Sequence, residues 1–500
     1  MNIQTHAPVL SAEEAAALIP HDAMIGFSGF TSAGAAKAVP RALAQRAKAL
    51  HAAQTPFKLK VLAGASTGKS VDSALAEANA ISSRVGYQSS RELRKQINAE
   101  EVDFIDIHLS HLPQMVQSGS LGKLDFAVIE ATEYSPDGRV YLSTSIGASP
   151  TYLECADKVI IEINRYHSPR LSEMTDILSV KRPPHRDLIP IFNPLSKAGR
   201  QYASVDPQKV VGIVYTDEPD EVPPFAAPDK TSELISNHVV EFLLWKMSTG
   251  QIPKEFLPIQ SGVGNIGNAV MNGLGHHKDI PPFTMFTEVL QDSIVDLMES
   301  GKVQGASTCA LTILPENLER IYNNMDFFAP RVVLRPQDIS NNPTLARQLG
   351  VIAINTALEV DIYGNVNSTH VCGTDMMNGI GGSGDFERNG YLSIFVCPSI
   401  AKGGKISTIV PMCTHIDSSE HSVDAIITEQ GIAYIRNLSP KKRAEVIIEN
   451  CVHPMYKDFM RDYLASCKKG HIRHNLSRCF ELHQNLLEQG AMLPGLRETA

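Results

Sequence analysis

Short apolar runs rich in β-branched residues recur along the chain and alternate with stretches of helical periodicity. A run that is apolar on both faces is typical of a strand inside a parallel sheet, and the stretches between such runs have room for crossover helices. The pattern therefore predicts an α/β fold with mostly parallel sheets. In the first half the predicted strands are 24–30, 59–65, 102–109, 125–131, 158–164 and 210–216, and the predicted helices are 12–18, 39–50 and 91–97.

The strand pattern begins again after residues 217–229, a segment rich in proline and acidic residues that we interpret as a linker. Four landmarks recur at an offset of about 230 residues, such as Gly138-Arg-Val140 and Gly364-Asn-Val366. The repetition predicts two tandem related open α/β domains, 1–220 and 221–500, with an active site in the interdomain cleft. The predicted strands of the second half are 256–260, 283–287, 305–312, 331–334, 351–355, 392–397, 407–412 and 424–428.

Charge and cysteine usage restrict the class of protein. The net charge is −9, and no continuous basic stripe of the kind that binds nucleic acid is present. The 8 cysteines are scattered without a Cys-x-x-Cys pair, which is typical of reduced thiols. No run approaches the roughly 18 apolar residues of a membrane span, and the N-terminal region shows a helix-capping pattern, Ser11 to Glu14, in place of a signal peptide. We expect a cytoplasmic protein with neither nucleic-acid nor membrane partners.

Other motifs with chemical associations are incomplete. Residues 63–70 resemble a phosphate-binding P-loop, but alanine replaces the first glycine, so we interpret them as a strand-to-helix turn. The turn 26–34 lacks the glycine spacing of a dinucleotide fingerprint, and it either closes a sheet edge or lines a substrate site. No histidine pair has metal-binding spacing, and no Gly-x-Ser-x-Gly nucleophile motif occurs. We expect no metal site and no classical hydrolase triad.

Glu288 is the candidate for a reactive group. It follows the apolar run 282–287 and precedes an amphipathic helix predicted to begin near Val289. Two glycine-rich turns, 261–265 and 379–386, offer backbone N–H groups to an anion or a developing oxyanion. A glutamate at the start of a helix is also explained by the helix dipole alone. The second turn, with Asn378 before it and Lys402 after it, favours a site for a phosphate-bearing ligand instead.

Over nearly its whole length the chain resembles the class I coenzyme A transferases. The resemblance is to the branch that contains succinyl-CoA:acetate and propionyl-CoA:succinate CoA-transferases and proteins called acetyl-CoA hydrolases. It rests on motifs that end at Thr31 (Ser-Gly-Phe-Thr), Asn265 (Gln-Ser-Gly-Val-Gly-Asn), Gln291 (Thr-Glu-Val-Leu-Gln), Pro343 (Ser-Asn-Asn-Pro), Thr369 (Asp-Ile-Tyr-Gly-Asn-Val-Asn-Ser-Thr), Phe386 (Met-Asn-Gly-Ile-Gly-Gly-Ser-Gly-Asp-Phe), Ser407 (Ala-Lys-Gly-Gly-Lys-Ile-Ser) and Gly431 (Thr-Glu-Gln-Gly).

The resemblance implies a role for each matching residue. Glu288 matches the family nucleophile, which forms a mixed anhydride and then a glutamyl-CoA thioester. The backbone N–H groups of Val263 and Gly382 match oxyanion donors, and Asn341 and Glu429 match polar positions beside the acyl group. Thr287 stands where some relatives have serine, which preserves the hydroxyl. The implied CoA contacts are Gly262, Val263, Gly264, Asn265, Ile266, Leu358, Asn378, Gly382 and Lys402.

The activity implied by the resemblance is a ping-pong transfer of CoA between succinyl-CoA and a short-chain carboxylate, with acetate as first choice, by a homodimer. CoA would be a substrate and a transient covalent adduct, and no tightly bound cofactor is expected. Exchange between propionyl-CoA and succinate is a close second reading, because the acyl pocket would differ by one methylene. The chain is also compatible with hydrolysis of acetyl-CoA, and with non-catalytic binding of CoA in which Glu288 is idle.

Overall fold

A computed structural model describes residues 7–224 and 227–493. The chain divides into two compact units, each formed from three segments. The units differ from the continuous halves 1–220 and 221–500, because parts of the second half pack with N-terminal residues. Unit 1 comprises Met1–Pro224, Thr284–Leu349 and Asn378–Asp385, and unit 2 comprises Phe225–Phe283, Gly350–Met377 and Phe386–Ala500.

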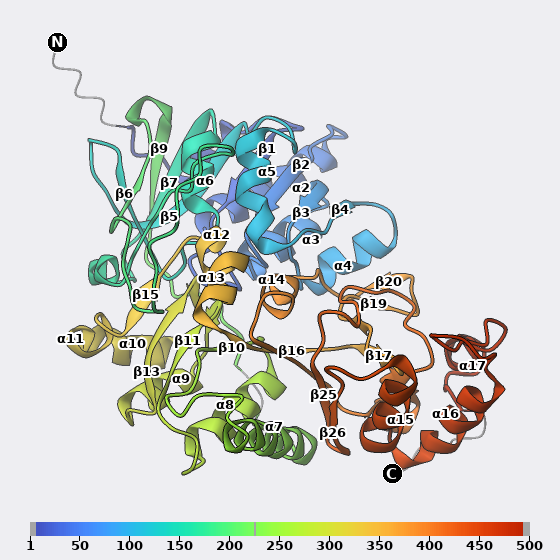
Figure 1. The fold of residues 1–500 in the computed structure, drawn as a ribbon. Coiled ribbons are helices and arrows are strands. Elements are labelled where there is room, and N and C mark those ends of the chain that lie inside the picture. The colour runs from blue at the N-terminus through green and yellow to red at the C-terminus, as the bar shows by residue number, and fades with distance from the viewer. Residues whose placement is uncertain (1–6, 225–226, 494–500) are drawn as a thin grey trace. The chain divides into compact units, whose positions relative to one another are not determined.

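Unit 1 contains a nine-stranded sheet that confirms the predicted α/β class (Figure 1, blue to green). Strands β4, β3, β2, β1, β5, β7 and β9 lie in this order and all pair in parallel. Strands β6 and β8 extend from β5 with antiparallel pairing. The bounds are β1 Met24–Phe27, β2 Leu59–Ala63, β3 Ile81–Val85, β4 Asp103–Ile105, β5 Phe126–Tyr134, β6 Arg139–Leu142, β7 Lys158–Asn164, β8 Ala203–Ser204 and β9 Val210–Thr216.

Helices cover this sheet with apolar side chains. Ile25 and Phe27 of β1 and Val39 and Leu43 of α2 are fully buried in one hydrophobic core, and removal of such surface from water is the main stabilising contribution to folding. The predicted capping box at the start of α1 is confirmed by reciprocal hydrogen bonds between Ser11 and Glu14. The helices of this part are α1 Ala12–Ala17, α2 Ala38–Ala52, α3 Ala74–Glu77, α4 Arg91–Asn98, α5 Leu112–Ser118 and α6 Ser149–Cys155.

Residues 284–349 join unit 1 through backbone hydrogen bonds to the N-terminal half. Ile146 N–H donates to the Cys309 carbonyl at 3.0 Å, and Leu311 N–H donates to the Thr144 carbonyl at 2.9 Å. These bonds explain why this segment belongs to unit 1. Strand β11, Phe283–Phe286, and helix α14, Ser383–Glu387, each cross a unit boundary. The elements inside the segment are β12 Val289–Leu290, α9 Ser293–Glu299, β13 Val303–Thr308, β14 Ala310–Leu311, α10 Pro315–Asn323, α11 Met325–Phe328, β15 Val332–Leu334, α12 Gln337–Ser340 and α13 Pro343–Leu349.

Unit 2 repeats part of the strand succession of unit 1. Strands β10, β16, β21 and β25 pair in parallel one after another, as β1, β5, β7 and β9 do. This succession agrees with the predicted tandem relation. The bounds are α7 Lys230–Ser248, β10 Ile259–Ser261, α8 Asn265–His276, β16 Ile352–Thr356, β17 Glu359–Asp361, β18 Val366–Asn367, β19 His370–Val371, β20 Asp375–Met376, β21 Leu392–Val396, β22 Ile400–Ala401, β23 Ile406–Ser407, β24 Ile409–Val410, β25 Ala425–Thr428, β26 Gly431–Tyr434, α15 Pro440–Cys451, α16 Pro454–Ser466 and α17 Glu481–Gln489.

The predicted linker 217–229 contains the boundary at Pro224, and its residues 225 and 226 lie outside the described residues. The part before the boundary is fixed in unit 1 by its carboxylates. Glu218 pairs with Arg41 at 2.7 Å, and Glu221 accepts hydrogen bonds from the N–H (2.8 Å) and the hydroxyl (3.1 Å) of Ser70. Ser70 ends the P-loop-like turn, so a carboxylate of the chain itself is bound at that turn.

Across the described ranges, no helix is both long enough and apolar enough to cross a lipid bilayer.

Candidate active site

Glu288 lies in unit 1 between β11 and β12, and it does not begin a helix. The prediction of a helix from Val289 is wrong, because Val289 and Leu290 pair in parallel with Ala310 and Leu311 and α9 begins only at Ser293. The helix dipole therefore gives no local reason for a glutamate at this position.

The backbone of Glu288 is fixed by the end of β13 and the start of β14. Its carbonyl accepts hydrogen bonds from the N–H of Cys309 (2.9 Å), the N–H of Ala310 (3.2 Å) and the hydroxyl of Thr308 (3.0 Å). Thr308, Cys309 and Ala310 are buried. Three donors on one carbonyl hold the main chain in place, which limits the directions that the side chain can take.

The Glu288 carboxylate is desolvated, and it accepts a hydrogen bond from the side-chain amide of Asn341. Burial raises the pKa of Glu288, whereas the hydrogen bond from Asn341 Nδ2 to Oε2, at 2.9 Å, lowers it. A carboxylate with a raised pKa is a more basic nucleophile, provided that it is ionised. Asn341 is fully buried at the C-terminal end of α12. Its amide is thus placed to hold Oε2 of the carboxylate.

Removal of the Asn341 amide gives a prediction about pH. In N341A the lowering contribution to the pKa of Glu288 is lost, so ionisation requires a higher pH. We expect the acid limb of the kcat/KM profile to move to higher pH and the plateau to fall about 10- to 100-fold, in line with the loss of a hydrogen bond to a charged group. The measurement is kcat/KM for an acyl-CoA between pH 5 and 9, and an unmoved acid limb would contradict a role of the Asn341 amide in setting the pKa of Glu288.

Gly382 packs directly against this carboxylate. A Cβ atom at position 382 would overlap Glu288 Oε2 and Asn341 Nδ2 and would lie 2.9 Å from the Glu288 carboxyl carbon. Only glycine fits, and its backbone can therefore approach a group that reacts at Glu288. The structure brings together Glu288, Asn341 and Gly382, three of the residues singled out in the sequence. Asn378, also in unit 1, donates its side-chain amide to the Gly379 carbonyl at 2.9 Å.

The remaining candidates belong to unit 2, where residues 262–266 lead from the end of β10 into the first turn of α8. Gly264 is the N-cap residue with φ of 128°, and nothing lies within 4 Å of a Cβ built there. Val263 is 39% exposed. The Gly262 N–H is bonded to the Ile354 carbonyl of β16 at 2.9 Å, which anchors the loop. An open loop at the N-terminus of a 12-residue helix suits an anionic ligand.

Leu358, Lys402 and Glu429 have distinct surroundings within unit 2. Lys402 is exposed and has a φ of 47°, in the turn that continues with two glycines. Glu429 accepts hydrogen bonds from the N–H of Ser399, at 2.8 Å, and from the Ser399 hydroxyl. Leu358 is half-buried between β16 and β17. Lys402 is thus exposed to solvent, and Glu429 is held in one orientation.

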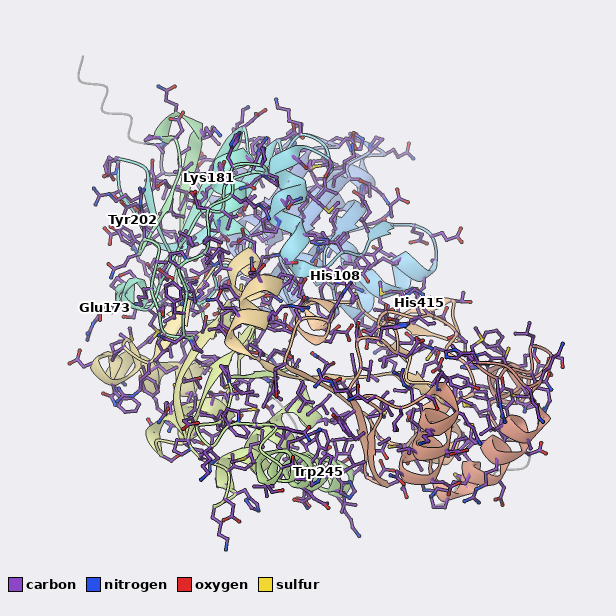
Figure 2. All side chains as sticks on the ribbon, in the orientation of Figure 1. His108, Glu173, Lys181, Tyr202, Trp245 and His415 are labelled. Carbon is purple, nitrogen blue, oxygen red and sulfur yellow. The ribbon has the colours of Figure 1, made fainter. Side chains whose placement is uncertain are left out.

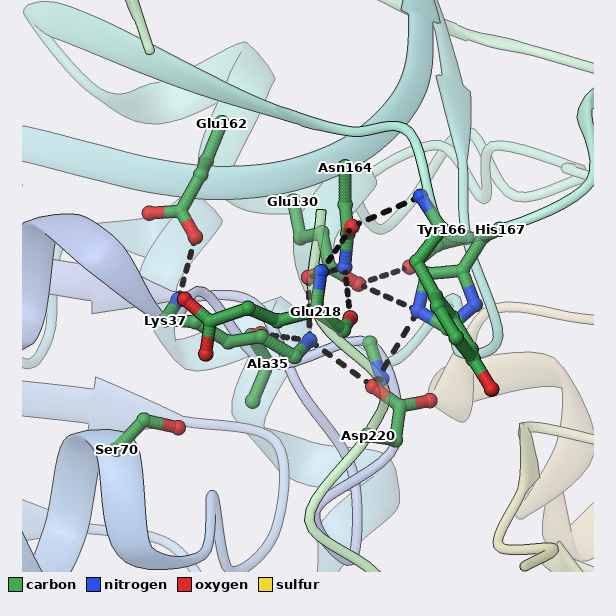
Figure 3. Close-up of polar contacts among 12 residues, drawn as sticks. Ala35, Lys37, Ser70, Glu130, Glu162, Asn164, Tyr166, His167, Glu218 and Asp220 are labelled. Atoms are coloured by element: carbon green, nitrogen blue, oxygen red, sulfur yellow. Dashed lines mark hydrogen bonds and ion pairs between the residues drawn. The ribbon is translucent and has the colours of Figure 1, made fainter. Parts of the chain in front are cut away.

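A second polar cluster lies in the core of unit 1 (Figure 3). Ligand atoms of Glu130, His167 and Asp220 lie within 4.8 Å of one another, as in a metal site. Lys37 Nζ, however, contacts Glu130 at 2.5 Å, Asp220 at 3.0 Å and the Ala35 carbonyl at 2.9 Å. The lysine ammonium thus takes the place of a cation between the carboxylates, and we interpret the cluster as a buried ion-pair network.

The protonation of this network is set by competing effects. Burial lowers the pKa of Lys37, but Asp220 and Glu130 outweigh it and raise the pKa. Burial likewise opposes protonation of His167, yet the same two carboxylates raise its pKa to about 9. Both bases are therefore charged at neutral pH.

We expect K37M to lower the free energy of unfolding by about 3–5 kcal/mol, because it leaves two buried carboxylates short of one positive charge. The matched control is K60M. Lys60 pairs with Asp22 in solvent, at 38% and 59% side-chain exposure, and its loss should change stability by about 0–1 kcal/mol. Denaturant unfolding of the three proteins measures the difference, and equal midpoints for K37M and K60M would contradict it.

Several residues around Glu288 were missed by sequence reasoning. Tyr87 lies against the glycine turn, 3.3 Å from a Cβ built at Gly381, and burial, with the charge of Glu288, raises its pKa to about 12. Asp106 and Ser110 contact the same turn from 274 and 275 residues away in the sequence. No local pattern in the sequence marks these residues, and only a prediction of which segments meet would have found them.

Comparisons with known proteins identify the family. Family models for the acetyl-CoA hydrolase/transferase N-terminal and C-terminal domains match residues 4–215 and 318–464. The chain is 54% identical to propanoyl-CoA:succinate CoA transferase of Escherichia coli K12, over 98% of this chain and 100% of that protein. It is 44% identical to succinyl-CoA:acetate CoA-transferase of Clostridium kluyveri, over 98% of this chain and 91% of the relative.

A solved structure shows the same fold. RipA from Yersinia pestis superposes with a TM-score of 0.69 at 22% sequence identity, over 91% of this chain and 96% of that one. At this identity the likeness concerns the fold alone. The two domain models and the identity over almost the entire length establish the family, and the chain belongs to the acetyl-CoA hydrolase/transferase family.

Proposed function

We propose that the protein is a CoA-transferase that moves CoA between succinyl-CoA and a short-chain carboxylate, with Glu288 as nucleophile. The observation that carries the proposal is the setting of Glu288, a desolvated carboxylate on a fixed backbone, held by Asn341 and in contact with the backbone of Gly382. Similarity to two CoA-transferases over 98% of the chain supports the reaction class.

The proposed chemistry proceeds in two half-reactions. A Glu288 carboxylate oxygen attacks the thioester carbonyl, and the carbon–sulfur bond breaks to give a mixed anhydride and the CoA thiolate. The thiolate then attacks the Glu288 carbonyl, which forms the glutamyl-CoA thioester and releases the donor carboxylate. The acceptor carboxylate reverses these steps, and Glu288 is regenerated. Holding the reactants together removes the entropic cost of encounter, and the N–H groups of Gly382 and Val263 are the proposed oxyanion donors.

We assign CoA binding to the residues that match the CoA contacts of the family. The exposed Lys402 and the open N-terminus of α8 are suited to the phosphate-bearing part of CoA. No metal or tightly bound cofactor is part of the proposal, because exchange of one carboxylate for another on CoA is nearly thermoneutral. The proposed contacts are Gly262, Val263, Gly264, Asn265, Ile266, Leu358, Asn378, Gly382 and Lys402, with Asn341 and Glu429 beside the acyl group.

Acetate and propionate are the two candidate partners of succinyl-CoA. The relative named for propanoyl-CoA is 54% identical and the one named for acetate is 44% identical. One methylene in a pocket is worth about 1–3 kcal/mol, so the two rates should differ by about 10- to 200-fold. Rates with acetate and propionate at equal concentration decide between them.

We also propose a homodimer in the cytoplasm. All 8 cysteines are free, which fits a reducing compartment. Light scattering of the purified protein tests the dimer.

A trapping experiment tests the mechanism. The protein is incubated with succinyl-CoA without acceptor, treated with borohydride and digested, and the peptide containing Glu288 is examined by mass spectrometry. We expect the glutamyl thioester to be reduced to the alcohol at Glu288 and at no other carboxylate. Thioester loss at full rate without a carboxylate acceptor, with no adduct, would instead indicate the hydrolase that the family name also includes.

A further inference from the structure

We propose that Asp385 and Ser110 are positioning residues that hold the glycine turn 379–385 against the nucleophile. The proposal rests on the function proposed above for Glu288 and Gly382. It gives a role to Asp385 and Ser110, which the proposed mechanism does not yet use.

Asp385 is bound by Ser110 through both carboxylate oxygens. The Ser110 hydroxyl donates to Oδ1 at 2.6 Å, and the Ser110 N–H donates to Oδ2 at 3.0 Å. The Asp385 N–H in turn donates to the Gly382 carbonyl at 3.1 Å. Asp385 is only 3% exposed. A displacement of Asp385 is therefore transmitted to the Gly382 carbonyl.

The same segment of chain, residues 106–110, holds the other side of the turn. The Asp106 carboxylate accepts the Ile380 N–H at 2.8 and 3.1 Å, and the Leu109 N–H donates to the Gly381 carbonyl at 3.4 Å. His108, labelled in Figure 2, packs so closely that a Cβ at Gly384 would lie 2.8 Å from its Nδ1. Residues 380–385 are thus fixed at both ends while Gly382 faces Glu288.

Burial and the nearby Glu288 carboxylate both disfavour the ionised form of Asp385. Burial raises the pKa of Asp385 to about 7, and the charge of Glu288 adds to the effect. An asparagine would accept the Ser110 N–H through Oδ1 and donate its amide to the Ser110 hydroxyl without any charge. The contacts of Asp385, and not its ionisation, are therefore the property that positioning requires, and this distinction makes the proposal testable.

The experiment compares D385A, D385N and S110A with wild type, using succinyl-CoA and acetate. We expect D385A to lower kcat about 30- to 100-fold while KM for succinyl-CoA changes less than about threefold, because a shift of about 1 Å in a catalytic group costs about this much. D385N should recover most of kcat. S110A, which removes the hydroxyl but keeps the N–H, should lower kcat about 3- to 10-fold.

The matched control is D361A in unit 2. Asp361 is also buried and is likewise held by hydrogen bonds, here from two backbone N–H groups, those of Tyr363 at 2.9 Å and Asn365 at 3.0 Å. We expect it to lower the unfolding temperature as D385A does but to leave kcat of the folded protein close to wild type. Equal kcat losses in D385A and D361A, or no recovery in D385N, would overturn the positioning role.

Two further comparisons distinguish failure of the Asp385 role from failure to fold and from failure of the proposed function. If D385A does not fold, S110A and D385N decide the question, because a wild-type kcat in S110A together with a strongly reduced kcat in D385N contradicts the proposal. E288A is assayed in parallel. Full activity of E288A would refute the proposed function itself, whereas an inactive E288A with a fully active D385A would refute only the role of Asp385.

Discussion

Replacement of Glu288 by alanine is expected to reduce carboxylate-dependent CoA transfer by at least about 1,000-fold, because the group that forms both covalent intermediates is lost. The backbone at this position is held by Thr308, Cys309 and Ala310 through the carbonyl, which alanine retains. The variant should therefore fold normally and still bind acyl-CoA. The measurement is the initial rate of succinyl-CoA-dependent acetyl-CoA formation.

E288D and E288Q are the informative companions of E288A. Aspartate keeps the charge but moves it back by one methylene, so we expect a rate between those of wild type and E288A. Glutamine keeps the shape and the contact with Asn341 but cannot form the anhydride, and it should be as inactive as alanine. Transfer by E288Q above a tenth of the wild-type rate would contradict the role of nucleophile.

G382A is expected to lower kcat about 100-fold or more without loss of the fold. The added Cβ would occupy the space of Glu288 Oε2 and Asn341 Nδ2, so the carboxylate must turn away or the glycine turn must move. Either response misplaces a reacting group by about 1 Å, for which losses of about 100-fold are typical. The measurement is kcat for transfer from succinyl-CoA to acetate, with the adduct at Glu288 followed by mass spectrometry.

The control for G382A is G470A. Gly470 is exposed in unit 2, and the nearest atom to a Cβ built there is the Ile472 carbonyl oxygen at 3.4 Å. We expect wild-type turnover from this variant. Wild-type turnover from G382A as well would mean that the contact with Glu288 has no part in catalysis.

The local sequence pattern predicted strands well where valine and isoleucine make up most of the strand. Strands β7 and β9 have the predicted bounds, because valine and isoleucine dominate Lys158–Asn164 and Val210–Thr216. Strand β3 was missed because it contains two serines and Arg84, which is buried in an ion pair with Asp72 at 2.9 Å. A charge that is neutralised by a distant partner cannot be recognised from the strand itself.

Some predicted strands were too long for a related reason. The predicted strand 102–109 is reduced to β4, Asp103–Ile105, since the residues that follow turn away to meet the glycine turn. The predicted strand 305–312 is interrupted between β13 and β14 at Cys309, whose N–H is bonded to the Glu288 carbonyl. In both places the contacts of the candidate site override local strand preference.

The candidate site was predictable to the extent that it is encoded in motifs. Glu288, Asn341 and Gly382 were identified from the motifs that carry the family resemblance, and the structure places them in contact. Asp106 and Ser110 were not identified, because their importance lies in bonds to residues about 275 positions away. Such pairings depend on the path of the whole chain, which the periodicity of short segments does not contain.

The division of the chain into units has a consequence for how such an enzyme can be modified. A cut at the predicted linker would leave Glu288 on the C-terminal fragment and remove Thr144 and Ile146, which bond to the strand beside it. The same cut would separate the glycine turn from Asp106 and Ser110. The C-terminal half alone therefore lacks the residues that support the candidate site, and it cannot be moved into another protein as a working unit. Chimaeras between relatives should exchange 284–349 and 378–385 together with the N-terminal residues that support them.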